Sequence, residues 1–179
     1  MRTLYIITKV ITYPGAFLKG FWEHVTCRIL KIKVLDNNYH AFDFHGGHVK
    51  HEDAATPAKT FLLALLPNIM QQLFGWIFVA AASPLLLFGL RGPSDSYFFW
   101  LYAVALFFGL SLLCNSFAQW EDAKHQWRMF YGKNAQASLA AKILLAPCNA
   151  WFFAGAWLER TGISTLVLFG GAVLAIVLY

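Results

Sequence analysis

The sequence has few charged side chains. Only 13% of its 179 residues are Asp, Glu, Lys or Arg, and 59% are hydrophobic, whereas soluble domains have about 25% and about 45–50%. So few charges cannot coat a soluble domain of this length, and composition therefore excludes that class. The net charge of +5 comes from basic residues that lie between apolar runs. This distribution is typical of membrane orientation and argues against nucleic acid as a partner.

Cysteine is also scarce. The three cysteines form no Cys-x-x-Cys pair, which argues against a disulfide framework and a zinc knuckle. Cys27, Cys114 and Cys148 each lie in an apolar segment, so we predict buried thiols. The N-terminal stretch has Lys9 within its apolar run and no small-residue cleavage site, so no removable signal peptide is expected.

Most of the chain consists of apolar segments of about the length that spans a bilayer. We therefore predict an all-α polytopic membrane protein with about four or five transmembrane helices and a small cytoplasmic or re-entrant β-hairpin. It forms a single integral membrane domain over residues 1–179. Residues 159–162 are expected to be a turn, and Pro67 and Pro84 are expected to break or kink the second helix. The expected helices cover residues 4–30, 60–90, 97–118, 137–158 and 163–179.

Two polar segments separate these helices. Residues 31–59 contain turn signals between short strand-like runs and predict the hairpin, whereas residues 119–134 mix charges with aromatics and predict an interfacial helix. If every helix spans, both segments share one membrane face with the C-terminus. Most basic residues lie on that face, so the positive-inside rule predicts that loops 31–59 and 119–134 are cytoplasmic.

The first apolar segment carries unusual charge. Lys9, Lys19, Glu23, His24 and Arg28 all fall within it. A charge near the bilayer centre costs about 2.5–3.5 kcal/mol on insertion scales. This helix is therefore expected at the centre of the bundle, with its polar face turned inward.

Three motifs occur in an order that resembles a known family. Residues 13–15 (Tyr-Pro-Gly) open a helix, residues 47–52 (Gly-His-Val-Lys-His-Glu) precede an apolar helix, and residues 115–123 (Asn-Ser-Phe-Ala-Gln-Trp-Glu-Asp-Ala) follow another. Over roughly residues 10–130 the chain resembles small prokaryotic membrane metalloproteases related to site-2 proteases. The resemblance implies a prokaryotic inner or plasma membrane. It also implies a zinc site formed by a His-Glu-x-x-His helix and a later Asp.

The zinc motif itself is missing. Its five positions fall at residues 19–23, where Lys19 and Glu23 replace both histidines and Gly20 replaces the catalytic glutamate. Only Asp122 keeps a plausible ligand position under the resemblance. A zinc hydrolase needs neutral His ligands and a general base, so no proteolysis is expected and the chain is predicted to be a pseudoenzyme.

The replacing residues suggest a charge cluster in place of the metal. Lys19 and Glu23 are four residues apart and share one helix face. Our hypothesis is that the Lys19 ammonium pairs with Glu23 and Asp122, within about 6 Å of at least one of them. The alternative is that Lys19 extends to an interface and that the charges are unrelated.

The histidines offer two further candidate sites. His45, His48 and His51 recur every third residue and could bind a transition metal, or they are polar loop residues. His24 follows Gly20 by one helical turn and could be the axial ligand of a chlorophyll or haem, or it is a hydrogen-bonded histidine of the bundle. No cofactor is part of the leading interpretation.

The leading interpretation is a non-catalytic site-2-protease-like scaffold or accessory subunit of a larger membrane complex. Its partners would be membrane lipid and other transmembrane proteins, which the hairpin could dock by strand addition. One alternative is a metal-dependent membrane enzyme with a remodelled site built from His24, His51, Glu52 and Asp122. Another is a cofactor-holding subunit of a photosynthetic or respiratory assembly, with His24 as ligand.

Overall fold

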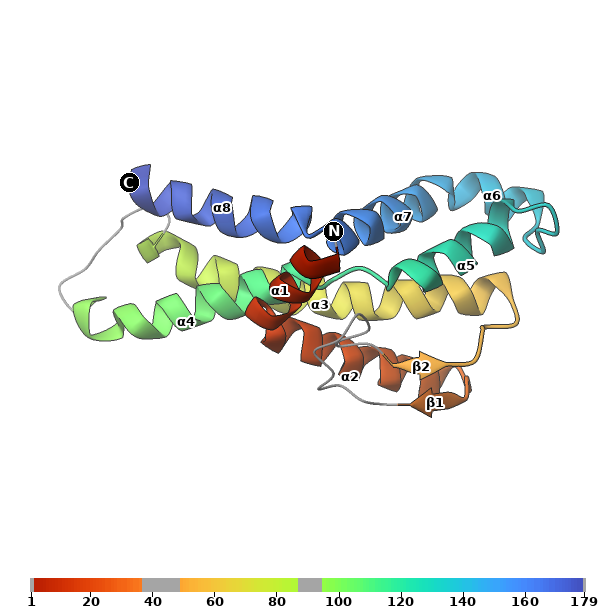
Figure 1. The fold of residues 1–179 in the computed structure, drawn as a ribbon, viewed down its shortest axis with the longest axis horizontal. Coiled ribbons are helices and arrows are strands. Elements are labelled where there is room, and N and C mark those ends of the chain that lie inside the picture. Colours follow the sequence, from red (N-terminus) through yellow and green to blue (C-terminus); the bar gives the residue numbers. More distant parts are fainter. Residues whose placement is uncertain (1, 37–48, 87–94, 179) are drawn as a thin grey trace.

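The computed structural model describes residues 2–36, 49–86 and 95–178. These residues are mostly helical and contain eight helices and one two-stranded antiparallel sheet (Figure 1). The helices are α1 (Arg2–Ile11), α2 (Tyr13–Ile29), α3 (Pro57–Leu86), α4 (Asp95–Cys114), α5 (Trp120–Tyr131), α6 (Leu139–Leu144), α7 (Ala146–Thr161) and α8 (Ile163–Leu178). The strands are β1 (Val34–Asp36) and β2 (Lys50–His51).

The first apolar segment is two helices, so the prediction of one helix over residues 4–30 is wrong. α1 ends at Ile11, and Thr12 is in a non-helical conformation before α2. Pro14 is in the first turn of α2. Proline has no backbone N–H and its ring clashes with the carbonyl four residues earlier, so one helix cannot run through this point undistorted.

The second and third apolar segments form the long axis of the molecule. α3 is assigned as one helix from Pro57 to Leu86, with Pro67 and Pro84 inside it, and it packs along α4. The two backbones approach closely at Gly75 and Gly109. A Cβ added at Gly109 would lie 2.9 Å from the Gly75 carbonyl oxygen. Small residues at such a crossing allow close helix packing.

The C-terminal segments differ from the prediction. The segment expected over residues 137–158 is divided into α6 and α7, and Pro147 lies in the first turn of α7. The turn expected at residues 159–162 is wrong, because α7 continues to Thr161 and ends at Gly162, which has a positive φ of 77°. α7 and α8 then meet at a bend of 77°. Cys148 is exposed at the start of α7, so the prediction of three buried thiols fails there.

The hairpin prediction over residues 31–59 agrees with the structure as far as the described residues go. Val34 pairs with His51 and Asp36 with Lys50, with an irregularity between the two pairs. Residues 37–48, which include two of the predicted metal-binding histidines, lie outside the described residues.

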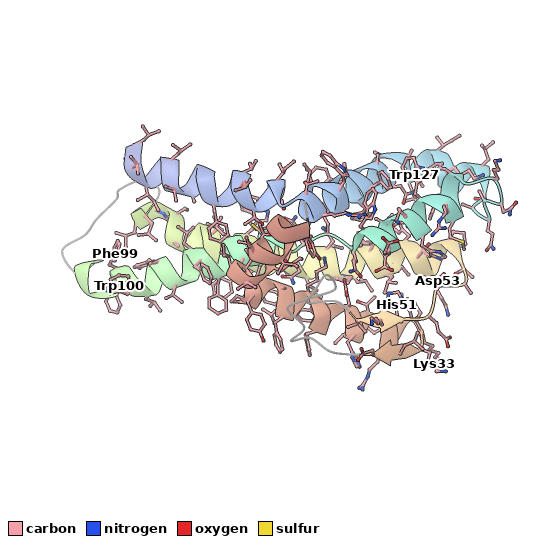
Figure 2. The ribbon with its side chains drawn as sticks, viewed as in Figure 1. Lys33, His51, Asp53, Phe99, Trp100 and Trp127 are labelled. Atoms are coloured by element: carbon pink, nitrogen blue, oxygen red, sulfur yellow. The ribbon has the colours of Figure 1, made fainter. Side chains whose placement is uncertain are left out.

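Apolar and charged residues gather at opposite ends of the molecule. Residues 60–86, 98–114 and 163–178 contain no Asp, Glu, Lys or Arg. Figure 2 shows Phe99 and Trp100 at one end, and Lys33, His51 and Asp53 toward the other. The C-terminus is at the apolar end, away from the hairpin and α5 (Figure 1), and not beside them as predicted.

Membrane-spanning helices are supported in part. Within the described residues, α3 is long and apolar enough to cross a bilayer, and the bent pair of α7 and α8 makes a second if it counts as one span. The apolar part of α4, Phe98–Cys114, is shorter. The structure therefore shows one or two candidate spans, and the number of four or five stays a prediction.

Candidate functional site

A buried carboxylate lies where α1, α2, α4 and α7 meet. The Glu159 side chain extends from α7 and is only 5% exposed. Its Oε1 accepts hydrogen bonds from Lys9 Nζ and Lys19 Nζ, each at 2.6 Å. Its Oε2 accepts the backbone N–H of Phe117 at 3.1 Å. A buried charge is costly unless it is paired and hydrogen-bonded, and Glu159 satisfies both conditions.

The α1 side of this cluster is fixed by a polar network. Lys9 Nζ also donates to Asn115 Oδ1 at 2.5 Å. Asn115 Nδ2 donates in turn to Thr12 Oγ1 at 2.8 Å. The break between α1 and α2 therefore rests directly on the C-terminal end of α4, which positions Lys9 beside Glu159.

The α2 side depends on a close backbone contact. Ser111 Oγ accepts the backbone N–H of Gly15 at 2.8 Å and donates to the Thr12 carbonyl at 2.9 Å. A Cβ at Gly15 would overlap the backbone of Ser111. Gln71 Nε2 donates to the Gly15 carbonyl at 2.9 Å. Because Gly15 has no side chain, α2 approaches α4 closely, and Lys19, one turn further on, can reach Glu159.

A second group of charges continues from Lys19 toward the hairpin. Glu23, one turn after Lys19 on α2, places another negative charge near that ammonium. Its Oε2 accepts the backbone N–H of Val49 at 3.3 Å. Glu23, His51 and Asp122 line one cavity of about 10 Å³, which is the size of a single water site. Lys19 therefore lies between two groups of charged side chains: Lys9 and Glu159 on one side, and Glu23, His51 and Asp122 on the other.

Two histidine–aspartate pairs connect the hairpin region to α5. His51 Nε2 lies 3.7 Å from Asp122 Oδ2, and His125 Nδ1 lies 3.8 Å from Asp53 Oδ2. His125 Nε2 is also 3.2 Å from the Ala54 carbonyl oxygen. In one pair the histidine is on β2 and the aspartate on α5, whereas in the other the histidine is on α5 and the aspartate follows β2. Together the two pairs fix β2 and the following loop against α5.

The pKa of His51 is set by these neighbours. Burial alone would lower it, but the Asp122 carboxylate, the Glu52 carbonyl and the charge of Glu23 raise the pKa from 6.5 to about 9. His51 is therefore a cation at neutral pH, and its contact with Asp122 is an ion pair.

The predicted site residues are distributed between these groups. The structure brings Lys19 to Glu159, and places Glu23 and Asp122 on the same small cavity. His24 is half-buried on α2, and Glu52 faces Lys33 at the surface at 3.5 Å. His45 and His48 lie outside the described residues. Among those described, no three His, Cys, Asp or Glu side chains are arranged to hold a metal ion.

Sequence reasoning missed the central carboxylate. The sequence predicts a turn at Glu159 and indicates no partner for Lys9 or Asn115. One signal was present: Lys9 and Lys19 are two lysines in one apolar segment, and such charges pair inside a bundle. Glu159, the acidic residue that pairs with both lysines, directly follows the apolar stretch 137–158.

No protein-family model, no curated protein and no solved structure matches this chain.

Proposed function

We propose that this chain is a non-catalytic membrane protein that acts as a scaffold or accessory subunit of a larger membrane complex. Its apolar end lies in the bilayer, and its hairpin and α5 lie at the cytoplasmic face. One observation carries the proposal: the position at which the resemblance expects a zinc ligand holds Lys19, whose ammonium is 2.6 Å from Glu159.

This arrangement supports a structural role for the cluster. The Lys19 side chain is 5% exposed and paired with Glu159, so its ammonium would repel a metal cation at this position. Both oxygens of Glu159 are engaged by donors from other segments. The cluster therefore holds the helices in register, as a bound metal ion can do in other proteins.

Partner binding is assigned to the hairpin. Leu35 on β1 is 60% exposed although it is apolar, and within the part of the chain that the structure describes β1 pairs only with β2. An exposed strand edge with an apolar side chain suits strand addition by a partner segment.

The test is purification of the tagged native chain in mild detergent, with its companions identified and counted. We expect a particle larger than one chain with membrane proteins at fixed stoichiometry, reduced by Leu35→Asp but not by Leu139→Asp. Leu139 is a comparable exposed leucine on α6. A lone chain without companions, or zinc-dependent cleavage of a transmembrane peptide, would overturn the proposal.

A remodelled metal site is the alternative that the sequence leaves open; Glu23, His51 and Asp122 line one small cavity, although the described residues contain no group of three arranged to hold a metal ion. Elemental analysis of the purified chain decides it. One transition metal per chain that is lost in both His51→Ala and Asp122→Ala would replace the scaffold proposal, and a metal content unchanged by these substitutions would reject the site. A visible absorption spectrum of the same sample tests a pigment on His24, which a colourless complex would exclude.

A further inference from the structure

A large cavity lies between α3, α4 and α8 toward the apolar end of the molecule. Its volume is about 580 Å³. Leu85 comes from α3, Ala103 and Phe107 from α4, and Phe169 and Ala172 from α8. Every lining side chain is aliphatic or aromatic. The cavity is separate from both charge groups described above.

The space exists because α8 does not close fully onto α4. The Phe107 and Phe169 rings meet edge to face at 6.0 Å and join the two helices. Ala103 and Ala172, which also line the cavity, are too small to fill the gap. A larger side chain at either position would project into it.

The volume and lining identify the class of occupant. The space is open to the surface, since Val173 on its wall is 57% exposed, and its volume lies within the range of small-molecule sites, which is about 300–1,000 Å³. An ordered water needs two to four polar partners, and among the described residues no lining side chain supplies one. A polar ligand would lose its hydrogen bonds for the same reason. The lining therefore favours a hydrocarbon as occupant.

We infer that this cavity holds one acyl chain of a membrane lipid, an inference that rests on the proposed membrane location. The surface around the cavity is apolar and exposed, with Val104 at 52% and Val173 at 57%, so it is continuous with the surface that would face the bilayer. A helix from a second copy fits less well. A helix is about 10–12 Å wide, and a volume of about 580 Å³ would take in little more than one turn of it.

The inference is tested on the chain purified from membranes in mild detergent. Native mass spectrometry and lipid extraction measure the lipid retained per chain. Ala103→Phe and Ala172→Phe fill the cavity, and Val104→Phe adds the same bulk to the neighbouring exposed position. We expect one phospholipid per wild-type chain, at least about tenfold lower occupancy in the two filling variants, and wild-type occupancy in Val104→Phe.

A second measurement keeps the test independent of how the variants fold. A phospholipid with a photoreactive acyl chain is added to the wild-type chain, and crosslinks are expected on the segments around Phe107 and Phe169. Crosslinks only elsewhere, no retained lipid in the wild type, or equal retention in all variants would overturn the inference. So would a lipid-free dimer that Ala103→Phe dissociates.

Alkaline extraction of membranes separates this inference from the proposed function. A chain released into the soluble fraction would contradict the membrane location itself. A chain that stays in the membrane but retains no lipid would contradict only the acyl-chain inference.

Discussion

At the residue scale, the molecule depends on one carboxylate shared by two lysines. Glu159 is 5% exposed and sits between Lys9 and Lys19. Removing one partner from a buried charge group leaves an uncompensated charge, which costs about 3–5 kcal/mol. Exposed pairs contribute only about 0–1 kcal/mol, because water and salt screen them.

The first prediction follows from this difference. Glu159→Ala should lower the free energy of unfolding by about 3–5 kcal/mol, because it leaves two buried ammonium groups and the Phe117 N–H without their acceptor. Denaturant unfolding in detergent measures the change. Glu121→Ala is the control, since Glu121 is exposed and pairs with the partly exposed Lys124, and it should change stability by less than about 1 kcal/mol. Equal losses in the two variants would contradict the prediction.

The second prediction concerns His51. Its pKa is raised to about 9 in the folded chain from 6.5. The ion pair with Asp122 is therefore a stabilising contribution that is fully present below about pH 6.5 and lost as the pH rises through about 9. NMR titration of the ring should give a midpoint near 9 that falls in Asp122→Asn and stays in place in Glu121→Gln. A midpoint near 6.5 in the unaltered chain would contradict this.

The residues show how far sequence reasoning reaches. The cost of burying a charge correctly placed Lys19 inside the fold, because that argument needs only local information. It did not identify Glu159, which is 140 residues away in sequence and looked like the polar start of a turn. His125 and Asp53 were missed for a similar reason, since their pairing depends on how α5 docks.

At the scale of elements, one glycine determines how closely α2 and α4 pack. Gly15 has its backbone N–H on Ser111 Oγ and its carbonyl on Gln71 Nε2. The contact is between backbones, so a side chain there cannot be accommodated by a rotamer change. Gly170 on α8 is different, because a Cβ added there meets nothing within 4 Å.

The third prediction compares these two glycines. Gly15→Ala should destabilise the protein by at least about 1–3 kcal/mol, because the new methyl group forces α2 away from α4. Gly170→Ala should be neutral or stabilising by up to about 1 kcal/mol, since alanine favours the helix more than glycine does. Thermal unfolding of both variants in the same detergent checks the pair. A stable Gly15→Ala would show that the two helices are not held together at this point.

Element boundaries were less predictable than element types. Apolar runs indicated helices throughout, and the turn signals within residues 31–59 indicated the antiparallel pair. The boundary at Leu145 was missed because hydropathy continues across it while the helix does not, whereas Tyr-Pro-Gly at residues 13–15 indicated the helix start that the structure shows at Tyr13. Pro14 and Pro147 marked both places, since proline is tolerated in the first turn of a helix and disfavoured in its interior.

At the scale of the whole molecule, charge and hydrophobicity are separated along the long axis. The hairpin and α5 lie at the charged end and the C-terminus at the apolar end (Figure 1). In a bilayer this arrangement places the hairpin and α5 at one membrane face and the end of α8 toward the other face.

The fourth prediction is this topology. In a Cys148→Ser background, which removes the exposed native thiol, Lys33→Cys and Lys133→Cys should react with a membrane-impermeant thiol reagent only after the cells are permeabilised. Leu178→Cys should react in intact cells if α8 reaches the opposite face. Labelling of Lys33→Cys or Lys133→Cys from outside would reverse the assigned orientation.

The pairing of Lys9 with Glu159 also bears on how the chain is made. The two residues are 150 positions apart, so Lys9 leaves the ribosome 150 residues before its partner does. Until then Lys9 and Lys19 have no buried carboxylate on α7 to receive them, and contacts of such long sequence separation form late. α1 and α2 therefore reach their final depth only after α7 has been synthesised. The N-terminal helices would thus pack last against helices that are synthesised after them.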